Sequence, residues 1–459
     1  MAQVAFLLNG DPVRLNQVSA TTTLLNWLRE SRGLNGTKEG CNEGDCGACT
    51  VMVTDERGSR SVNACILFLP QLHGKAVRTV EGISGPSGDL HPVQSAMVDH
   101  HGSQCGFCTP GFVVSMAVAH KNGETDYDDR LAGNLCRCTG YAPIIRAAKA
   151  AASAPVPDWM NDTAPGDIAD FDATDAVAMP KSSDELAAWY ADNPDAVLVG
   201  GATDVGLWVT KRLDDLGKVA FLSGVADLKN IEETEDGMTI GACVTVNEFG
   251  AAIQPHYPSF AEMIRRYGSV QVRNAATLGG NIANGSPIGD SPPALIALGA
   301  FLTLRKGDVR RRIPIEEFFL TYGKQDRAPG EFVESIFIPK QKDRLKCYKI
   351  SKRFDQDISA VCGCFSIGVS DGVVTQAHIA FGGMAGIPQR ALAVETALVG
   401  QDWTKETVQA AMELFKNDYR PMTDMRASAE YRLDTARNLL MRYYLEDQGQ
   451  DVNVLEVSQ

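Results

Sequence analysis

The sequence predicts a multidomain α+β protein, and three observations lead to this fold class. With 459 residues, the chain is too long for a single hydrophobic core. Eight of its 12 cysteines lie before residue 140, in two groups of four. From about residue 181, strand-like and helix-like segments are mixed, without an internal repeat. We therefore expect each cysteine group and the later mixed region to belong to separate domains.

The first domain is expected over residues 1–85, which read as strands with tight turns and one helix. Two strand-like segments flank a hairpin turn at 9–10. A helix is predicted over 21–33, and two further strands surround a turn at 57–58. The order strand, strand, helix, cysteine-rich loop, strand is ferredoxin-like.

The second domain is expected over residues 86–155, where four short segments have helical spacing. Pro110 and Pro143 follow closely on the two cysteine pairs of this region, so each pair is expected at the start of a helix. Residues 156–180 contain prolines, Asp and Ala without periodicity, which predicts a linker.

Two mixed α/β domains are expected in the rest of the chain, over residues 181–342 and 343–459. The first of them opens with a helix that Ser182 or Ser183 caps, followed by a buried strand that ends in a glycine pair. The second contains three strands, a short helix and a long helical tail that ends near Asp447.

Composition and charge exclude several classes of function. Hydrophobic residues make up 44% and charged residues 22%, as in ordinary globular proteins. The net charge of −14 opposes binding to nucleic acid or to an anionic membrane. The best apolar run, 294–304, is too short to span a bilayer, and the N-terminus lacks the pattern of a signal peptide. We expect a cytoplasmic protein that binds neither nucleic acid nor membrane.

The first quartet of cysteines has the spacing C-x4-C-x2-C with a distant fourth cysteine, which is the plant-type [2Fe–2S] pattern. Glycines in this loop allow the backbone to approach the cluster closely, so that its amides can donate to the sulfurs. A zinc site is the alternative, but the lone fourth cysteine does not fit paired zinc ligands. The ligands predicted are Cys41, Cys46, Cys49 and Cys65.

The second quartet combines C-x2-C with C-x-C, a spacing that by itself leaves a four-cysteine zinc site open. Its stretches "QCGFCTPG" and "GNLCRCTGY", placed after the first quartet, resemble the iron–sulfur region of the molybdenum hydroxylases. That family includes xanthine dehydrogenases, aldehyde oxidases and molybdenum-type carbon monoxide dehydrogenases. The resemblance implies a second [2Fe–2S] cluster near the molybdopterin and a pterin contact at Gln104. The ligands so implied are Cys105, Cys108, Cys136 and Cys138.

Two glycine-rich stretches, 196–206 and 277–293, are tight turns by their composition alone. Neither contains G-x-G-x-x-G, so a Rossmann site is not predicted. Both resemble loops of the family's two-lobed, non-Rossmann FAD domain, which implies FAD contacts here. Tyr267 and Lys352 resemble further positions near the flavin, and the charged loop 349–357 is a candidate for steering a dinucleotide. The contacts implied in the two stretches are Leu198, Val199, Gly200, Gly201, Ala202, Thr203, Asp204, Thr277, Gly280, Asn281, Ser286 and Asp290.

The resemblance covers nearly the whole chain, and it implies the fold of each part. Residues 1–85 would be a ferredoxin-like β-grasp [2Fe–2S] domain, and residues 86–155 a four-helix-bundle [2Fe–2S] domain. The FAD domain would occupy residues 181–342, and a C-terminal flavin-associated α+β domain 343–459. No catalytic side chain is expected, because the cofactors carry the chemistry. The four later cysteines, at 243, 347, 362 and 364, read as small buried hydrophobic residues.

The function implied is that of the electron-transfer small subunit of a two-subunit xanthine dehydrogenase. Its partner would be a molybdopterin-binding large subunit, in a dimer of heterodimers. Electrons from the oxidation of hypoxanthine or xanthine to urate would pass through the second quartet's cluster, then the first, then FAD, to NAD⁺. One alternative is the small subunit of a related hydroxylase for aldehydes or N-heterocycles. A second alternative is a zinc-binding scaffold without enzymatic activity.

Overall fold

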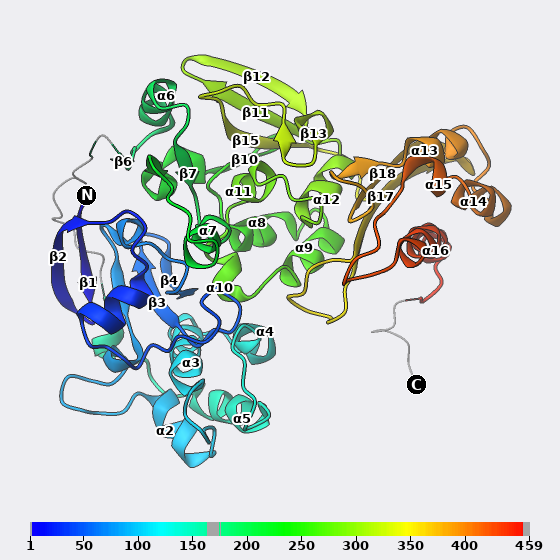
Figure 1. The fold of residues 1–459 in the computed structure, drawn as a ribbon. Coiled ribbons are helices and arrows are strands. Elements are labelled where there is room, and N and C mark those ends of the chain that lie inside the picture. The colour runs from blue at the N-terminus through cyan, green and yellow to red at the C-terminus, as the bar shows by residue number, and fades with distance from the viewer. Residues whose placement is uncertain (1, 163–173, 175, 453–459) are drawn as a thin grey trace. The chain divides into compact units, whose positions relative to one another are not determined.

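A computed structural model describes residues 2–162, 174 and 176–452, so positions 163–173 and 175 of the predicted linker at 156–180 lie outside the described residues. The chain divides into two compact units. Unit 1 comprises residues 1–181, 195–225 and 268–276, and unit 2 comprises 182–194, 226–267 and 277–459. Both mix helices and sheets, which confirms the multidomain α+β class (Figure 1).

Unit 1 begins with a five-stranded mixed sheet in the order β2-β1-β5-β3-β4. The predicted hairpins form: β1 pairs with β2, and β3 pairs with β4, both antiparallel. The predicted helix over 21–33 forms as a short α-helix followed by a π-helical turn, and Trp27 in it packs against Phe6. The elements are β1 Ala2–Leu8, β2 Asp11–Val18, α1 Leu24–Asn26, η1 Trp27–Ser31, β3 Thr50–Asp55, β4 Gly58–Asn63, η2 Leu69–Leu72, β5 Ala76–Arg78 and η3 Val80–Gly82.

Four helices follow in unit 1, as predicted, and α3 is their centre. Every residue of α3 from Gly111 to His120 is buried, because the neighbouring helices and β3 cover it. The two prolines lie in the first turn of α3 and α5, where the missing N–H costs nothing. The elements are α2 Pro92–Asp99, α3 Thr109–Asn122, α4 Tyr127–Leu131, α5 Ala142–Ala151 and η4 Asp158–Met160.

His91 makes part of this helical region sensitive to pH. Its Nδ1 accepts the N–H of Val93 and so caps α2, and its ring lies 5.2 Å from that of His120. Burial and the nearby His120 lower the pKa of His91 to about 4. The unfolded chain therefore binds one more proton between the ordinary histidine pKa and pH 4, so stability falls as the pH falls through that window.

Replacing His91 by Asn is expected to flatten this pH dependence. Asn retains a capping oxygen but does not titrate, so it removes an acid-induced loss of about 2 kcal/mol while keeping the cap. Urea unfolding at pH 4.5 and pH 7 measures the difference. His101→Asn is the matched control, since His101 is exposed at a φ of 54° that Asn tolerates. An unchanged pH slope in His91→Asn would contradict the assignment.

A small parallel sheet in the order β6-β8-β7 completes unit 1. Its core contains Phe68 and Phe221, whose rings meet edge to face at 6.4 Å. The elements are β6 Val177–Ala178, β7 Val197–Val199, α7 Val205–Thr210, β8 Val219–Phe221, η5 Leu222–Gly224 and α10 Val270–Arg273.

Unit 2 contains an antiparallel sheet in the order β12-β11-β15-β10-β9. Ser182 caps α6 by accepting the N–H of Glu185, as the sequence predicts. Strand β10 ends at Gly241, and Thr245 then caps α8. The elements are α6 Ser183–Asp192, η6 Asp227–Lys229, β9 Ile231–Glu233, β10 Gly237–Gly241, α8 Val246–Ile253, α9 Pro258–Arg265, α11 Leu278–Ala283, α12 Ser291–Ala297, β11 Phe301–Lys306, β12 Val309–Pro314, η7 Ile315–Phe318, β13 Phe319–Thr321, β14 Lys324–Gln325 and β15 Phe332–Pro339.

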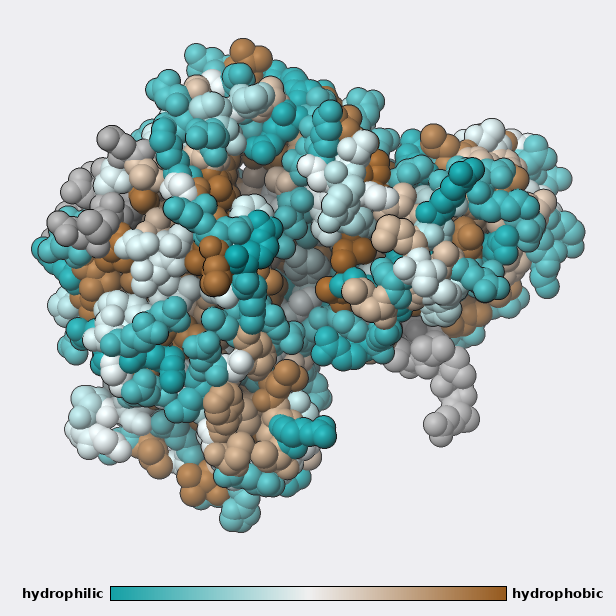
Figure 2. Space-filling view, in the orientation of Figure 1, coloured by the Kyte–Doolittle hydropathy of each residue, from teal (hydrophilic) through white to brown (hydrophobic). Residues whose placement is uncertain are grey.

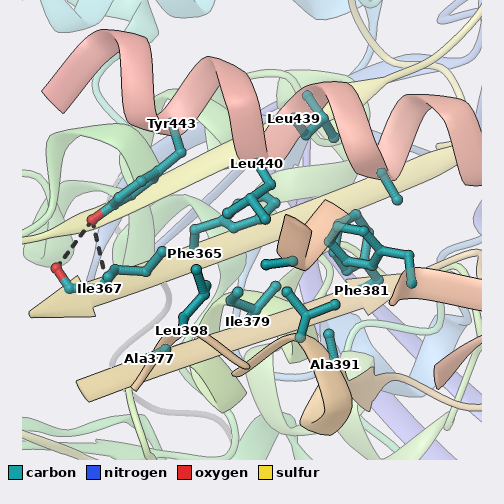
Figure 3. Close-up of a cluster of buried hydrophobic side chains, with 14 of the residues drawn as sticks. Phe365, Ile367, Ala377, Ile379, Phe381, Ala391, Leu398, Leu439, Leu440 and Tyr443 are labelled. Carbon is teal, nitrogen blue, oxygen red and sulfur yellow. Dashed lines mark hydrogen bonds between the residues drawn. The ribbon is translucent and has the colours of Figure 1, made fainter. Parts of the chain in front are cut away.

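The last part of unit 2 is a four-stranded antiparallel sheet, β16-β17-β18-β19, with helices packed against it. Figure 3 shows Leu440 and Tyr443 of α16 directed at Phe365 and Ile367 of β17, and the Tyr443 hydroxyl bonds to Ile367. The elements are β16 Leu345–Ile350, β17 Val361–Ser370, β18 Val373–Gly382, β19 Gln389–Arg390, α13 Leu392–Leu398, α14 Lys405–Met412, α15 Phe415–Asp418 and α16 Ala429–Asp447.

The predicted long helical tail is wrong in one respect, because residues 419–428 are not helical. Pro421 cannot continue the helix before it, and Ser428 starts a new one by accepting the N–H of Tyr431. The final helix does end at Asp447. Across the part of the chain that the structure describes, no helix is long and apolar enough to cross a membrane.

Candidate functional site

Two cysteines of the first quartet lie at the same end of the β3–β4 hairpin, one before β3 begins and one after β4 ends. Cys49 directly precedes β3, and Cys65 follows β4 by two residues. Because Thr50 and Asn63 are paired across these two strands, the hairpin brings Cys49 and Cys65 together. The thiol of Cys65 lies within hydrogen-bonding range of both Cys49 and Cys41.

The loop that carries Cys41 and Cys46 directs its backbone amides at the sulfurs. The N–H groups of Asp45 and Cys46 donate to Cys41 Sγ at 3.4 and 3.3 Å, and the N–H of Cys41 donates to Cys46 Sγ at 3.4 Å. Gly44 and Gly47 have φ of 80° and 70°, the left-handed region that this loop path requires. The predicted amide-to-sulfur contacts are therefore present, and they match the donor set that a [2Fe–2S] cluster needs.

The second quartet is held at the starts of α3 and α5. Cys108 is the N-cap of α3, and its thiol hydrogen-bonds with that of Cys136, while the thiols of Cys105 and Cys138 hydrogen-bond with each other. Burial and Cys136 raise the pKa of Cys108 to about 12. Among the described residues, no three His, Cys, Asp or Glu side chains converge as ligands of a single metal ion would.

Tyr141 is a further residue of the second quartet that the sequence did not reveal. It has a φ of 70°, which is unusual for an aromatic residue, at the N-cap of α5. This conformation brings its hydroxyl oxygen within 3.1 Å of the N–H of Cys136, which donates to it. Tyr141 therefore positions the backbone of Cys136 at the expense of local strain.

Hydrogen bonds join the loop of the first quartet to the loop before Cys136 of the second. The N–H of Leu135 donates to the carbonyl of Cys46 at 3.0 Å, and the Asn134 side-chain amide donates to the carbonyl of Gly47 at 3.0 Å. The Asn134 oxygen accepts from Ser115 at 2.7 Å and from Gln271 at 3.1 Å. Asn134, Ser115 and Gln271 are all buried, so they lock the loop before Cys136 against the loop that contains Cys46.

The first glycine-rich stretch lies near the first quartet, within unit 1. It leaves β7 at Gly200 and enters α7 at Val205. The Gln71 side chain, six residues after Cys65, donates to the carbonyl of Gly200 at 3.1 Å. The Lys211 ammonium, just after α7, donates to the carbonyl of Cys41 and lies 3.5 Å from Glu43. The stretch and the helix that follows it are therefore hydrogen-bonded to segments on both sides of the first hairpin's cysteines, through Gln71 after Cys65 and through Lys211 to Cys41.

This stretch leaves hydrogen-bond donors unused. Among the described residues, no acceptor is found for the N–H of Gly201, Ala202 or Thr203. Ala202 has a φ of 60°, and a Cβ on Gly201 would lie 1.8 Å from the carbonyl oxygen of Ala275, so only glycine fits there. Three consecutive free amides in a glycine turn are the donor set for a phosphate, so this part fits the phosphates of FAD.

The predicted contacts in unit 2 are centred on α11. Thr277 caps this helix by accepting the N–H of Gly280 at 3.1 Å. The Asn281 side chain donates to the hydroxyl of Tyr267 at 3.1 Å, which brings two predicted residues together. The other side-chain atom of Asn281, its Oδ1, is buried and has no partner among the described residues, as expected of an acceptor that a ligand satisfies. The Ser286 hydroxyl accepts the N–H of Ile288 at 3.3 Å.

Asp290, a predicted FAD contact, takes part in a buried ion pair. Its carboxylate lies 2.7 Å from the ammonium of Lys349 and accepts the hydroxyl of Ser359 at 2.5 Å, and all three residues are buried. Lys352, a predicted FAD contact, is exposed, and its ammonium donates to the carbonyl of Met425 at 2.6 Å. Lys349, the first residue of the charged loop 349–357 in the sequence, belongs to β16, where strand alternation places it on the same face as Cys347.

Two cysteines of the second quartet and several residues around them are open to solvent. Cys105, Cys138 and Gln104 are exposed, whereas Cys49 and Cys65 of the first quartet are 2% and 1% exposed. Phe107, Leu135 and Tyr141 are exposed beside them, at 48%, 48% and 41%. Figure 2 shows hydrophobic residues among hydrophilic ones on the surface over α4 and α5. Large apolar side chains grouped around an exposed site are typical of an interaction surface.

Four family models match the chain in the order of these features. A 2Fe-2S iron-sulfur cluster binding domain matches residues 6–69, and a [2Fe-2S] binding domain matches 79–149. An FAD binding domain in molybdopterin dehydrogenase matches 170–341, and a CO dehydrogenase flavoprotein C-terminal domain matches 346–447.

Similar proteins include several xanthine dehydrogenases. The xanthine dehydrogenase/oxidase of Gallus gallus is 31% identical over 96% of this chain, and the xanthine dehydrogenase of Emericella nidulans is 30% identical over 96% of it. This chain spans 40% and 38% of their lengths. Among solved structures, a chain of the carbon monoxide dehydrogenase of Hydrogenophaga pseudoflava is 28% identical with a TM-score of 0.55, covering 58% of this chain and 94% of that one.

Proposed function

Because the chain belongs to the molybdenum hydroxylase family, with two [2Fe–2S] domains and an FAD domain, we propose that it is the electron-transfer subunit of a xanthine dehydrogenase. The reaction proposed is the oxidation of hypoxanthine and xanthine to urate with NAD⁺ as acceptor. In such an enzyme the clusters carry single electrons, and the flavin converts them to a hydride. The molybdopterin would be held by a separate large subunit, in a dimer of heterodimers.

The observation that carries this proposal is the order of the three sites within unit 1. Two cysteines of the second quartet are exposed, the loop before Cys136 is bonded to the loop of the first quartet, and Gly200 of the glycine-rich stretch is bonded to Gln71, which follows Cys65. Hydrogen bonds join segments that flank each site to the next, through Asn134 and Leu135 for the two quartets and through Gln71 and Lys211 for the glycine-rich stretch. This order supports a relay that would start at a partner's surface and end at FAD.

The side chains of this chain would hold and orient the groups, with no acid–base role. The two quartets would ligate the clusters, and the amides of Gly201, Ala202 and Thr203 would bind phosphate oxygens of FAD. Asn281 Oδ1 would accept a hydrogen bond from the same cofactor. The exposed apolar residues around Cys105 would be covered by the partner, which would also exclude water from this cluster.

The exposed loop that follows β16 supports NAD⁺ as the acceptor. Lys352 and Arg353 are exposed in it, and both are cations that attract a dinucleotide phosphate. Lys349, three residues before Lys352 in the sequence, forms the buried ion pair with Asp290. We propose that this loop faces the nicotinamide nucleotide.

Co-purification of the chain with its partner, followed by activity assays, tests the proposal. We expect a flavin and [2Fe–2S] visible spectrum and urate and NADH formation from xanthine and NAD⁺. Activity only with aldehydes or N-heterocycles would replace xanthine dehydrogenase by a related hydroxylase. A colourless protein that contains zinc would contradict the whole assignment, because iron–sulfur and flavin centres absorb visible light.

A further inference from the structure

Cys347 contradicts the expectation that all four later cysteines are buried. Cys243, Cys362 and Cys364 are buried, but Cys347 on the edge strand β16 is partly exposed. It lines a cavity of about 860 Å³ in unit 2 whose walls come from α9, β16 and α16, including Ser259 and Arg442. A small solute can therefore reach the thiol of Cys347.

Cys347 is paired across the sheet with Cys364. The two residues are directly opposite each other in the antiparallel ladder of β16 and β17. The N–H of Cys347 donates to the hydroxyl of Ser259 at 2.8 Å, so it points away from β17. The two cysteines therefore form a non-hydrogen-bonded pair, the kind in which opposite Cα atoms are about 4.5 Å apart and side chains are closest. That separation lies within the range of roughly 4.4–6.8 Å found in disulfides.

The two thiols also differ in accessibility. Cys364 is fully buried, hydrogen-bonds with both Cys347 and Cys362, and has a pKa raised well above its usual value, chiefly by burial. Cys362 lies two residues earlier on the same face of β17, with its sulfur 3.5 Å from that of Met263. A reagent from solvent therefore meets Cys347 first, and Cys364 is the thiol placed to react next.

We propose that Cys347 is an oxidation site for a small neutral two-electron oxidant of the peroxide class, and that Cys364 converts the product to a reversible disulfide. Hydrogen peroxide transfers an oxygen atom to the Cys347 thiol, giving a sulfenic acid and water. The Cys364 sulfur then attacks the Cys347 sulfur, the sulfur–oxygen bond breaks, and the departing hydroxide takes the Cys364 proton as a second water. Both electrons pass from the sulfurs to peroxide, and a dithiol reductant reverses the reaction.

This disulfide would restrain the strand that holds Lys349. Cys347 and Lys349 are both on β16, and the Lys349 ammonium binds Asp290 and Ser359. Oxidation would therefore join β16 covalently to β17 two residues before the buried ion pair. The inference rests on strand register and exposure, so it stands independently of the proposed enzyme activity.

Peptide mapping tests the proposal in the holoprotein. The protein is treated with hydrogen peroxide, free thiols are alkylated, and trypsin is applied without reduction. Cleavage after Lys346 and Lys349 releases Cys347 in a peptide of its own, separate from the peptide over 354–390 that contains Cys362 and Cys364. We expect these two peptides to be linked in most molecules, and dithiothreitol to separate them.

Two serine variants identify the partner thiol. Cys364→Ser is expected to abolish the link and leave Cys347 as a sulfenic acid that dimedone traps. Cys362→Ser, a matched change on the same face of the same strand, is expected to keep it. Recovery of Cys347 only as an alkylated or irreversibly oxidised residue in the wild-type protein would overturn the proposal, whether or not the variants fold. A link that survives Cys364→Ser would overturn it too.

Discussion

Alanine in place of Gly47 is expected to prevent assembly of the first iron–sulfur site and to lower the free energy of unfolding by about 3–5 kcal/mol. Gly47 has a φ of 70°, where an L side chain costs about 1 kcal/mol. The larger cost is steric, because a Cβ would lie 2.2 Å from the carbonyl oxygen of Gly133 and 2.7 Å from the Asn134 amide. Relieving this clash separates the two cysteine loops and breaks the buried bond from Asn134 to Gly47.

Gly58→Ala is the matched control for this variant. Gly58 begins β4, which pairs with the strand that follows Gly47, and has a φ of 93°, but a Cβ there meets nothing within 4 Å. Only the backbone strain remains, so we expect a loss of about 1 kcal/mol and a normal iron content. Iron analysis, visible absorbance and urea unfolding of both variants measure the difference. Equal losses in the two variants would show that contact between the cysteine loops does not hold the site.

Sequence spacing predicted the parts of the molecule that follow local rules. The Asn9-Gly10 turn, the Ser182 cap and the proline-started helices α3 and α5 all form, because each depends on a few neighbouring residues. The amide-to-sulfur contacts around Cys41 follow from glycines within the same loop. The FAD contacts and ligand roles remain predictions, although Tyr267 and Asn281 are in contact.

Tertiary contacts explain what the sequence could not predict. Asn134 and Gln271 are 137 positions apart, and nothing local indicates that one amide will bond the other. Lys349 and Asp290 are separated by 59 positions, so nothing local indicates that they form a buried ion pair. The exposure of Cys347 depends on β16 being an edge strand, which is a property of sheet order and not of the residues around the cysteine.

The relay order leads to a second large expected effect, at Cys136. Replacing Cys136 by Ser is expected to remove one of two [2Fe–2S] signals in electron paramagnetic resonance, because a thiolate ligand is lost. In the complete enzyme we expect xanthine-to-NAD⁺ activity to fall by about 100-fold or more, since the site at the partner surface is interrupted. NADH-to-dye activity, which needs only the flavin end, is expected to remain near the wild-type level.

This split between two activities distinguishes a broken relay from a misfolded protein. A folding defect would lower both activities and release FAD. Loss of the surface cluster would lower only the xanthine-to-NAD⁺ activity, which needs every step of the electron relay. Cys243→Ser is the matched control, because Cys243 is buried in unit 2 and belongs to neither quartet. If Cys136→Ser kept both signals and full turnover with xanthine, the second quartet would not hold a cluster. If NADH-to-dye activity fell in parallel while FAD stayed bound, the order of sites in unit 1 would not be the path that electrons take.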